Sequence, residues 1–168
     1  MSPPVSQFES FFRANYTSVL RIARRVLNDD HLAEDVAQDV FIAARLRFGE
    51  TEGSSHAVGW VRVAAAHAAL NEARGRRRRA GRHLRAGAPA APPGPEELVL
   101  ERCSGDEVRR ALGRMPPRAS TVIVLRHSGL SYAEVAEAMG VKVGQVGTML
   151  RRAEAALRKE IEHGTRLS

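Results

Sequence analysis

The residues from Ser131 to Leu157, SYAEVAEAMGVKVGQVGTMLRRAEAAL, carry the pattern of two helices joined by a tight turn. Gly140 suits the turn because glycine adopts a positive φ without steric cost, and Ala136 is small where the helices touch. Ser131 and Glu134 have the spacing of a capping box, which fixes the start of the first helix. Apolar residues occupy the inward positions: Val135, Met139, Val141, Val146 and Met149. The pattern therefore predicts a helix–turn–helix.

A helix–turn–helix is typical of DNA-binding proteins, and an ordinary helical hairpin in a bundle is the alternative interpretation. Arg151 and Arg152 in the second helix favour a DNA-binding unit. The whole chain is also basic, since 26 Lys and Arg against 19 Asp and Glu give a formal net charge of +7. Nearly all of these cations are arginine, which suits phosphates and guanine edges. A basic balance alone is equally compatible with a membrane surface.

The first part of the chain, from about Ser6 to Arg79, has helical periodicity throughout. Ser6 and Glu9 again have the spacing of a capping box. The first helix is predicted to turn these residues inward: Phe8, Phe12, Tyr16, Val19, Leu20 and Ala23. The second has the clearest stripe: Ala33, Val36, Ala37, Val40, Phe41, Ala44 and Phe48. A third helix is apolar nearly all round from Ala57 to Leu70, which predicts burial on most sides.

The segment from Ala80 to about Pro95 contains four prolines and three glycines and offers little to pack, so it is predicted to be a linker. A short helix is expected from Glu96, and further helical segments follow it. No segment has the period of a strand. We therefore predict an all-α fold with two small helical domains, residues 1–79 and 104–168, joined by a flexible linker at residues 80–103.

The second predicted helix has an acidic and polar face opposite its apolar stripe, formed by Glu34, Asp35, Gln38 and Asp39. Five acids and no Lys or Arg lie between residues 28 and 44, which is unusual in a basic chain. The face is either a binding surface or a solvated helix side. His31, Asp35 and Asp39 have a spacing that metals use, but three residues without a further ligand shell predict no metal site.

The third predicted helix presents a polar stripe, because His67, Asn71, Arg74 and Arg78 lie four, three and four residues apart. Such side chains can hydrogen-bond base edges. Seven arginines between Arg74 and Arg85 would neutralise phosphates, which predicts strongly salt-dependent binding of nucleic acid. The alternative is a helix end with a solvated basic tail. The helix–turn–helix downstream favours the nucleic-acid interpretation.

Catalysis has little support in the sequence. The six histidines are scattered, no glycine-rich phosphate loop is present, and no serine or cysteine has an evident base beside it. The single cysteine, Cys103, excludes an intramolecular disulfide and a cysteine-rich zinc site. No apolar run approaches the roughly 20 residues of a membrane span, and no secretory signal is visible. We expect a cytoplasmic protein without cofactor, metal or membrane insertion.

Three segments in this order resemble the extracytoplasmic-function (ECF) group of bacterial RNA polymerase sigma factors. AEDVAQDVF, residues 33–41, is similar to the helix by which region 2 binds the polymerase clamp. GWVRVAAAHAALNEARGRRRR, residues 59–79, is similar to the helix that melts and reads the −10 element. MPPRASTVIVLRHSGLSYAEVAEAMGV, residues 115–141, with VGTMLRRAEAALR after it, is similar to region 4, which reads the −35 element.

The resemblance implies a transcription initiation factor, not an enzyme, whose partners are core RNA polymerase, promoter DNA and an anti-sigma factor. It also implies a monomer in the absence of partners. The implied polymerase contacts are Glu34, Asp35, Gln38 and Asp39. The implied −10 contacts are His67, Asn71, Arg74, Arg76, Arg77 and Arg78. The implied −35 contacts are Lys142, Gln145, Thr148, Arg151 and Arg152.

The chain departs from the pattern of the family at five positions, and one of them is Arg45, which replaces a usual tryptophan on the clamp-binding helix. His67 stands where asparagine is usual in the −10 helix, and Asn71 where aspartate is common. In the recognition helix, Gly147 replaces a basic residue and Met149 replaces a frequent arginine. A glycine inside a helix costs up to about 1 kcal/mol relative to alanine, so Gly147 suggests a close backbone approach.

Two other functions fit parts of the sequence. A self-sufficient helix–turn–helix regulator that binds an operator as a dimer would account for residues 131–157, but it leaves residues 33–79 without a role. A metal-dependent nuclease acting through His31, Asp35 and Asp39 would be an enzyme, and a cleavage assay would detect it. Neither accounts for the whole chain.

Overall fold

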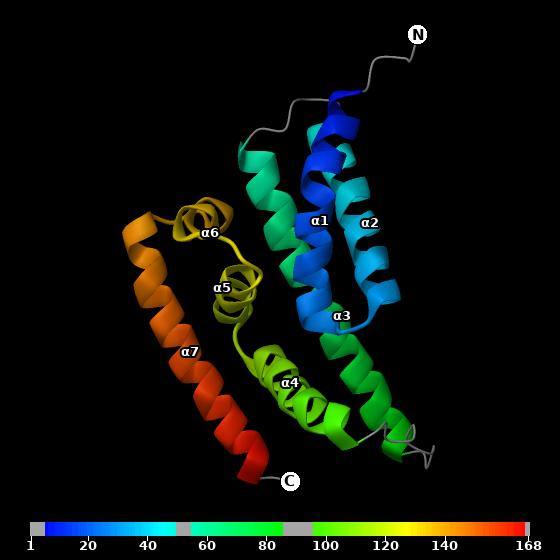
Figure 1. Cartoon of the computed structure of the whole chain (residues 1–168), viewed down its shortest axis with the longest axis vertical. Coiled ribbons are helices and arrows are strands. Elements are labelled where there is room, and N and C mark those ends of the chain that lie inside the picture. The colour runs from blue at the N-terminus through cyan, green and yellow to red at the C-terminus, as the bar shows by residue number, and fades with distance from the viewer. Residues whose placement is uncertain (1–5, 50–54, 86–95, 167–168) are drawn as a thin grey trace.

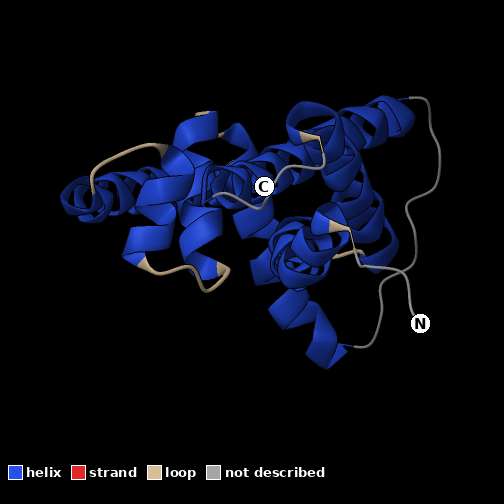
Figure 2. Ribbon diagram, turned by 90° about the horizontal axis from the view of Figure 1, so that it is seen from above, coloured by secondary structure: helices blue, strands red, loops and turns tan. Residues whose placement is uncertain are grey.

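The structure, a computed structural model, describes residues 6–49, 55–85 and 96–166, with side chains throughout these ranges except at 83–104 and 165. The described chain is helical and contains no strand, so the expected all-α fold is confirmed (Figure 2). The helices are α1 (Gln7–Leu27), α2 (Asp30–Phe48), α3 (Ser55–Arg85), α4 (Glu96–Arg114), α5 (Pro117–His127), α6 (Tyr132–Met139) and α7 (Val143–Arg166). None of these described helices is long and apolar enough to cross a membrane.

Helices α1, α2 and α3 pack against one another as a three-helix bundle (Figure 1). Short polar residues define the ends of the first two helices. Ser6 Oγ accepts the backbone N–H of Glu9 at 3.1 Å, and Asp29 accepts that of Leu32 at 3.1 Å. Between them Asn28 adopts the left-handed conformation, with a φ of 49°, and ends α1. These groups therefore end α1 and start α2 within a short connection.

The core of the bundle follows the predicted pattern closely in α2 and less closely in α1. The predicted stripe of α2 is buried, except that Phe48 at its end is half-buried. In α1, Val19 and Ala23 are buried, but the other four predicted residues are half-buried. The most buried face of α1 lies to one side and includes Phe11, Asn15, Ile22, Val26 and Leu27. The prediction differs because α1 packs on both α2 and α3, which broadens its apolar face.

Helices α6 and α7 form the predicted helix–turn–helix, and α5 packs against both. Both hydrogen bonds of the capping box are present, since the backbone N–H of Ser131 donates to Glu134 at 2.8 Å and the reverse bond measures 3.2 Å. Gly140 has a φ of 65°, and the N–H of Val141 reaches the carbonyl of Ala136 at 2.9 Å. These bonds satisfy backbone groups that the helix ends would otherwise leave unpaired.

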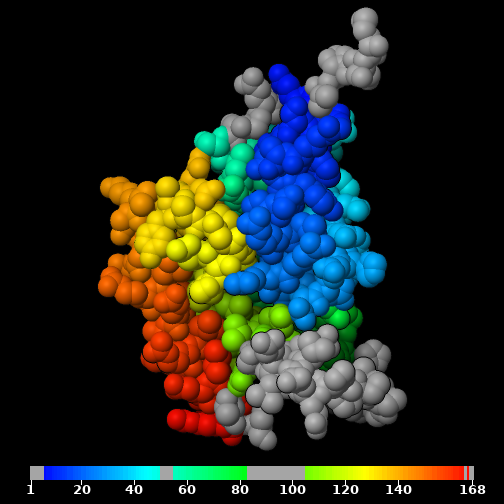
Figure 3. Space-filling model, viewed as in Figure 1, coloured from blue at the N-terminus to red at the C-terminus, as the bar shows by residue number. Residues whose placement is uncertain are grey.

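The two halves of the molecule pack together, because α3 contacts α4, α5 and α6 as well as the bundle. Figure 3 shows the yellow α5 directly against the blue α1. Buried residues of both halves belong to one continuous hydrophobic cluster. Helix α3 continues to Arg85 and α4 begins at the expected Glu96, so both helices extend into the predicted linker. Its middle, residues 86–95, lies outside the described residues.

Candidate nucleic-acid interface

The outer face of α2 carries the predicted acidic patch. Asp35, Gln38 and Asp39 are exposed, and Glu34 is half-buried at 3.9 Å from the guanidinium of Arg24. Asp35, Gln38 and Asp39 thus lie on the side of α2 opposite its buried stripe, whereas Glu34 lies at the edge of that side, next to α1. They therefore form an acidic surface open to a partner.

Two exposed apolar residues continue this surface toward the end of α2. Ile42 is 60% exposed and Leu46 is 84% exposed. With Asp35 and Asp39 they lie four, three and four residues apart, so they form one stripe along the helix. Sequence analysis missed them, although the same spacing rule that identified the stripe of α3 would have found them. Adjacent acidic and apolar side chains are suited to binding a protein surface.

The polar stripe of α3 is only partly open to solvent. His67, Asn71 and Arg78 are exposed. The Oδ1 atom of Asn71 accepts a hydrogen bond from Arg74 at 3.4 Å, which leaves the amide N–H groups of Asn71 available. These exposed groups can donate to and accept from base edges.

Arg74 and Arg77, on the same helix, are instead bound to the end of α4. Arg74 donates to the backbone carbonyls of Gly113 at 2.8 Å and Met115 at 3.2 Å. Arg77 donates to the carbonyls of Arg110 at 2.9 Å and Arg109 at 3.3 Å. The carbonyls near a helix C-terminus carry partial negative charge, and those of the last turn, such as that of Gly113, have no partner within the helix, so they attract cations. The two arginines therefore fasten α3 to α4.

This contact crowds positive charge around Arg77. Burial lowers the pKa of the Arg77 guanidinium, and the nearby Arg114, Arg110 and Arg74 lower it further. The carbonyls of α4 that accept hydrogen bonds from Arg77 partly offset this repulsion, but they carry no formal negative charge. A phosphate group would relieve the repulsion better than a neutral carbonyl does.

A cleft of about 550 Å³ opens beside these arginines, between the α1–α2 connection, α3 and α4. Its basic lining consists of Arg76, Arg77, Arg109 and Arg110. Two acids pair with part of this charge: Asp29 lies 3.6 Å from Arg76, and Asp106 lies 2.7 Å from Arg109. Sequence analysis did not assign the α4 arginines to the interface, because no local pattern shows that α4 packs beside α3.

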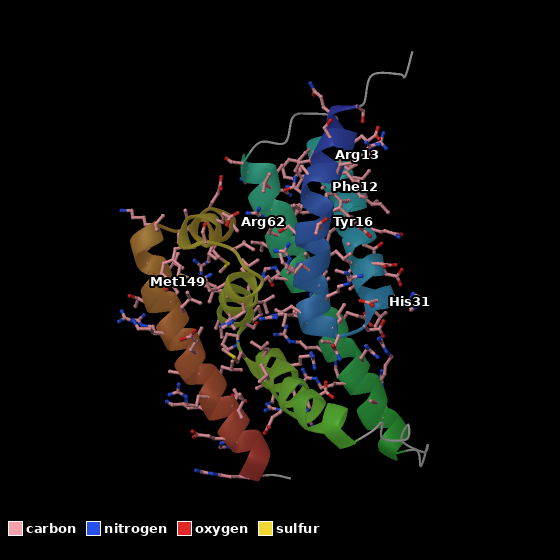
Figure 4. All side chains as sticks on the ribbon, in the orientation of Figure 1. Phe12, Arg13, Tyr16, His31, Arg62 and Met149 are labelled. Atoms are coloured by element: carbon pink, nitrogen blue, oxygen red, sulfur yellow. The ribbon has the colours of Figure 1, made fainter. Side chains whose placement is uncertain are left out.

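Helix α3 also contacts the first helix of the helix–turn–helix. Arg62, only 15% exposed, forms an ion pair with Glu134 at 3.1 Å, and Figure 4 shows it on the side of α3 toward α6. One turn earlier, a Cβ added to Gly59 would lie 3.2 Å from the Cα of Ala138. The absence of a side chain at Gly59 thus lets the backbones of α3 and α6 approach closely. The pKa of Glu134 is lowered, first by the backbone N–H of Ser131 and then, less, by Arg62.

The five predicted −35 contacts are exposed on α7 or just before it: Lys142, Gln145, Thr148, Arg151 and Arg152. They do not form one surface. Gln145, Thr148 and Arg152 line a groove of about 660 Å³ between α5 and α7, whereas Arg151 lines a second groove of about 460 Å³ on another side of α7. A hydrogen bond from Arg151 to the hydroxyl of Thr148, at 3.4 Å, connects these two sides of α7.

The larger groove also contains Met149, which sequence analysis placed on the inward face. Met149 is half-buried and projects from α7 toward α5 (Figure 4). Arg118, at the start of α5, lines the same groove and was not predicted. Only the packing of α5 beside α7 brings these residues together, so no pattern within the helix–turn–helix could have identified Arg118.

Within the described residues, no three His, Cys, Asp or Glu side chains gather as a metal site would require. His31 points outward at the start of α2 (Figure 4). The geometry supports binding surfaces in three places, namely the outer face of α2, the polar stripe of α3, and α7 with its grooves.

Two family models match the chain: Sigma-70 region 2 over residues 11–79, and Sigma-70, region 4 over residues 105–157. The chain is similar to the RNA polymerase sigma-H factor of Pseudomonas aeruginosa, at 30% identity over 159 residues, covering 86% of this chain and 80% of that protein. It is also similar to the ECF RNA polymerase sigma factor SigE of Mycolicibacterium smegmatis, at 29% identity over 155 residues. That match covers 90% of this chain and 60% of the length of SigE.

Two solved structures share the fold. The sigma factor RpoE from Bartonella quintana, in complex with the anti-sigma factor NepR, aligns with a TM-score of 0.50 at 21% identity, covering 94% of this chain and 98% of that one. CnrH, in complex with the cytosolic domain of CnrY, aligns with a TM-score of 0.54 at 20% identity, covering 93% of this chain and 88% of that one. The all-helical architecture is therefore found in known proteins.

Proposed function

The chain belongs to the sigma-70 family of RNA polymerase sigma factors, in the ECF group, and we infer from this that it directs core RNA polymerase to specific promoters. The observation that carries the inference is the order of three surfaces in one chain. The chain carries an exposed acidic face on α2, then a polar and arginine-rich stripe on α3, and then a helix–turn–helix. The first two surfaces lie within the region 2 match and the third within the region 4 match. A stand-alone operator-binding regulator would leave the first two surfaces without a role.

We propose that α2 binds the polymerase. The acids Asp35 and Asp39 would attract a basic partner surface, and Ile42 and Leu46 would bury apolar area beside them. This proposal assigns residues 1–79 to polymerase and −10 binding, with residues 80–103 as the connection and residues 104–168 as the −35 module.

We propose that α3 opens and reads the −10 element. His67 and Asn71 would hold bases extruded from one strand, and this extrusion costs a few kcal/mol that binding must offset. Arg76 and Arg78 would neutralise the backbone beside them. Arg74 and Arg77 can join them only after leaving the carbonyls of α4.

We propose that α7 enters the major groove at the −35 element. Gln145 and Thr148 would approach base edges, and Lys142, Arg151 and Arg152 would contact bases or phosphates. The polymerase would hold this helix apart from α3, so that each half binds weakly by itself and strongly when both are engaged. The protein would act by binding alone, without catalysis, in the cytoplasm.

We propose that an anti-sigma factor controls the protein. RpoE of Bartonella quintana, whose fold is similar, is bound to such a factor in its solved structure. A factor that held α3 against α4 and α6 would keep the arginines of α3 from DNA and the polymerase from separating the two halves.

In vitro transcription with core polymerase tests the proposal. The wild-type protein should support promoter-dependent initiation. Asp39→Arg should lose binding to core polymerase, because it reverses a charge in the centre of the α2 face. Arg152→Ala should bind core polymerase normally and lose promoter selection.

Glu162→Arg is the matched control, since it makes the same charge reversal at an exposed site near the end of α7. It should behave as the wild type. Tight, specific binding of duplex DNA by the free chain, with no response to core polymerase, would contradict the proposal.

A further inference from the structure

The groove between α5 and α7 has an apolar floor that the predicted contacts do not explain. We call it the recognition groove and define it by its apolar lining of Pro116, Ala119, Val122, Val141, Met149 and Ala153 and its polar lining of Arg118, Gln145, Thr148 and Arg152, with Gly144. We propose that Met149 makes this groove selective for a thymine in the −35 element, by contact with the thymine methyl group. This inference rests on the proposed function and adds a determinant of promoter choice.

The position of Met149 supports a role beyond the core. Met149 packs against the hydrophobic cluster with part of its side chain, but unlike its neighbours Val146 and Leu150 on α7 it is not fully buried. Met149 is half-buried and faces an open groove of about 660 Å³. Gln145 lies four residues before it on α7 and Thr148 one residue before, and both line the same groove. Any base edge that reaches Gln145 and Thr148 therefore lies beside Met149.

The charge of the groove identifies its occupant as DNA. Its rim carries two arginines, Arg118 from α5 and Arg152 from α7, and no acid is present among the lining residues. Two cations flanking an apolar floor complement a strip of bases between two phosphate backbones. A protein helix would fit this groove equally well only if it carried acidic side chains on both sides of an apolar stripe.

The chemistry of the major groove identifies the base. Thymine is the only base that presents a methyl group there, and apolar side chains read it by contact. Gln145 uses its Oε1 atom to accept the backbone N–H of Lys142 at 3.1 Å. Its amide N–H groups can still donate to the acceptors that bases present, such as thymine O4 or purine N7.

The first two turns of α7 lack the residue types that usually read guanine. From residue 143 to residue 150 the sequence is VGQVGTML, with no lysine or arginine. Guanine is most often read by a bidentate arginine or lysine, and none is available on these turns. On these two turns, the groove-lining side chains that can contact a base edge are Gln145, Thr148 and Met149.

Replacing thymine by deoxyuracil tests the proposal, since it removes only the methyl group. Holoenzyme formed from core polymerase and the full chain is first used to select promoters from DNA that is randomised across the −35 element. Selection should yield a thymine at one or more positions. Deoxyuracil at the position read by Met149 should weaken holoenzyme binding about fourfold, the worth of one buried methyl group.

Two variants assign the effect to Met149. Met149→Leu keeps an apolar side chain and should still distinguish thymine from deoxyuracil. Met149→Ala should bind both DNAs equally and no better than the wild type binds deoxyuracil DNA. Thermal unfolding of both variants ensures that the comparison is made between folded proteins.

Three results would overturn the proposal: no selected thymine, equal binding of both DNAs by the wild type, or full discrimination by Met149→Ala. A failure of the proposed function would look different. In that case the wild-type holoenzyme would select no promoter sequence at all, and the −10 element would be missing along with the −35 element.

Discussion

Arginines with similar sequence surroundings have very different environments in this protein. Arg74 and Arg77 are held by carbonyls of α4, whereas Arg78 on the same helix is exposed. Sequence analysis grouped all three as −10 contacts, because helical spacing shows which face a residue occupies but not what packs against that face. Arg118 is the opposite case, an exposed cation in a groove that becomes visible only when α5 is placed beside α7.

Arg118 offers a prediction at the scale of one residue. If it contacts a phosphate, Arg118→Ala should weaken holoenzyme binding to all selected promoters by a similar factor, without changing their order. The slope of log affinity against log salt concentration should fall by about 0.9, the value for one phosphate contact.

Titration of binding at several salt concentrations measures both quantities. Arg158→Ala removes an exposed arginine that lines neither groove and should leave the slope unchanged. A changed order of promoter preference in Arg118→Ala would show that Arg118 reads bases instead.

Among the helices, α6 has a double role that follows from its first turn. Glu134 closes the capping box with Ser131 and also pairs with Arg62 of α3. One carboxylate thus both starts the helix and attaches it to the other half of the molecule. The capping box and Gly140 were predictable from the sequence because both depend on local spacing. The pairing with Arg62 was not, since 72 residues separate the partners.

Glu134 gives a prediction about pH. Its pKa in the folded protein is below the ordinary value of 4.5, so folding favours the carboxylate. The resulting stabilisation is present at neutral pH and is lost as the pH falls from about 4.5 through the lower pKa of the folded protein. Glu134→Gln keeps a capping residue but loses the charge. It should lower the free energy of unfolding at pH 7 by no more than about 1 kcal/mol, since the pair is partly exposed.

Thermal unfolding of the two proteins between pH 3 and pH 7 checks this prediction. The difference in Tm should be a few degrees at pH 7 and should shrink below about pH 4.5. A difference that is constant over the whole range would mean that the charge of Glu134 contributes nothing.

For the molecule as a whole, the sequence predicted the helices and their order but not their assembly. The apolar stripes of α2 and of the helix–turn–helix are local patterns and were correct. The proline-rich segment predicted two domains on a tether, and a tether of this composition permits the domains to be splayed or folded together. In the structure the described halves are folded together and share one hydrophobic cluster. The reason is twofold: an apolar pattern shows which residues are buried but not which helix covers them, and the polar contacts of Gly59 and Arg74 leave no apolar pattern at all.

Separating the halves gives a prediction for the whole molecule. Gly59→Leu should force α3 and α6 apart, because even a Cβ at Gly59 would lie 3.2 Å from the backbone of Ala138. The radius of gyration measured by small-angle X-ray scattering should increase. Binding of single-stranded DNA by the free protein should also increase, since Arg74 and Arg77 would be released.

Gly81→Leu is the matched control on the same helix, because a Cβ at Gly81 meets no atom within 4 Å. It should leave both the scattering and the DNA binding unchanged. Equal radii of gyration for the two variants would show that α6 adapts to the larger side chain without moving away.

The attachment of Arg74 and Arg77 to α4 has a consequence for how such a protein can change over generations. The same two side chains hold the resting form together and would neutralise DNA in the working form. A substitution of either arginine changes both the stability of the resting form and the affinity of the working form for DNA, so neither property can be changed there alone. Variation that tunes only the threshold of activation should therefore accumulate at contacts used in one form, such as Gly59 and Ala138.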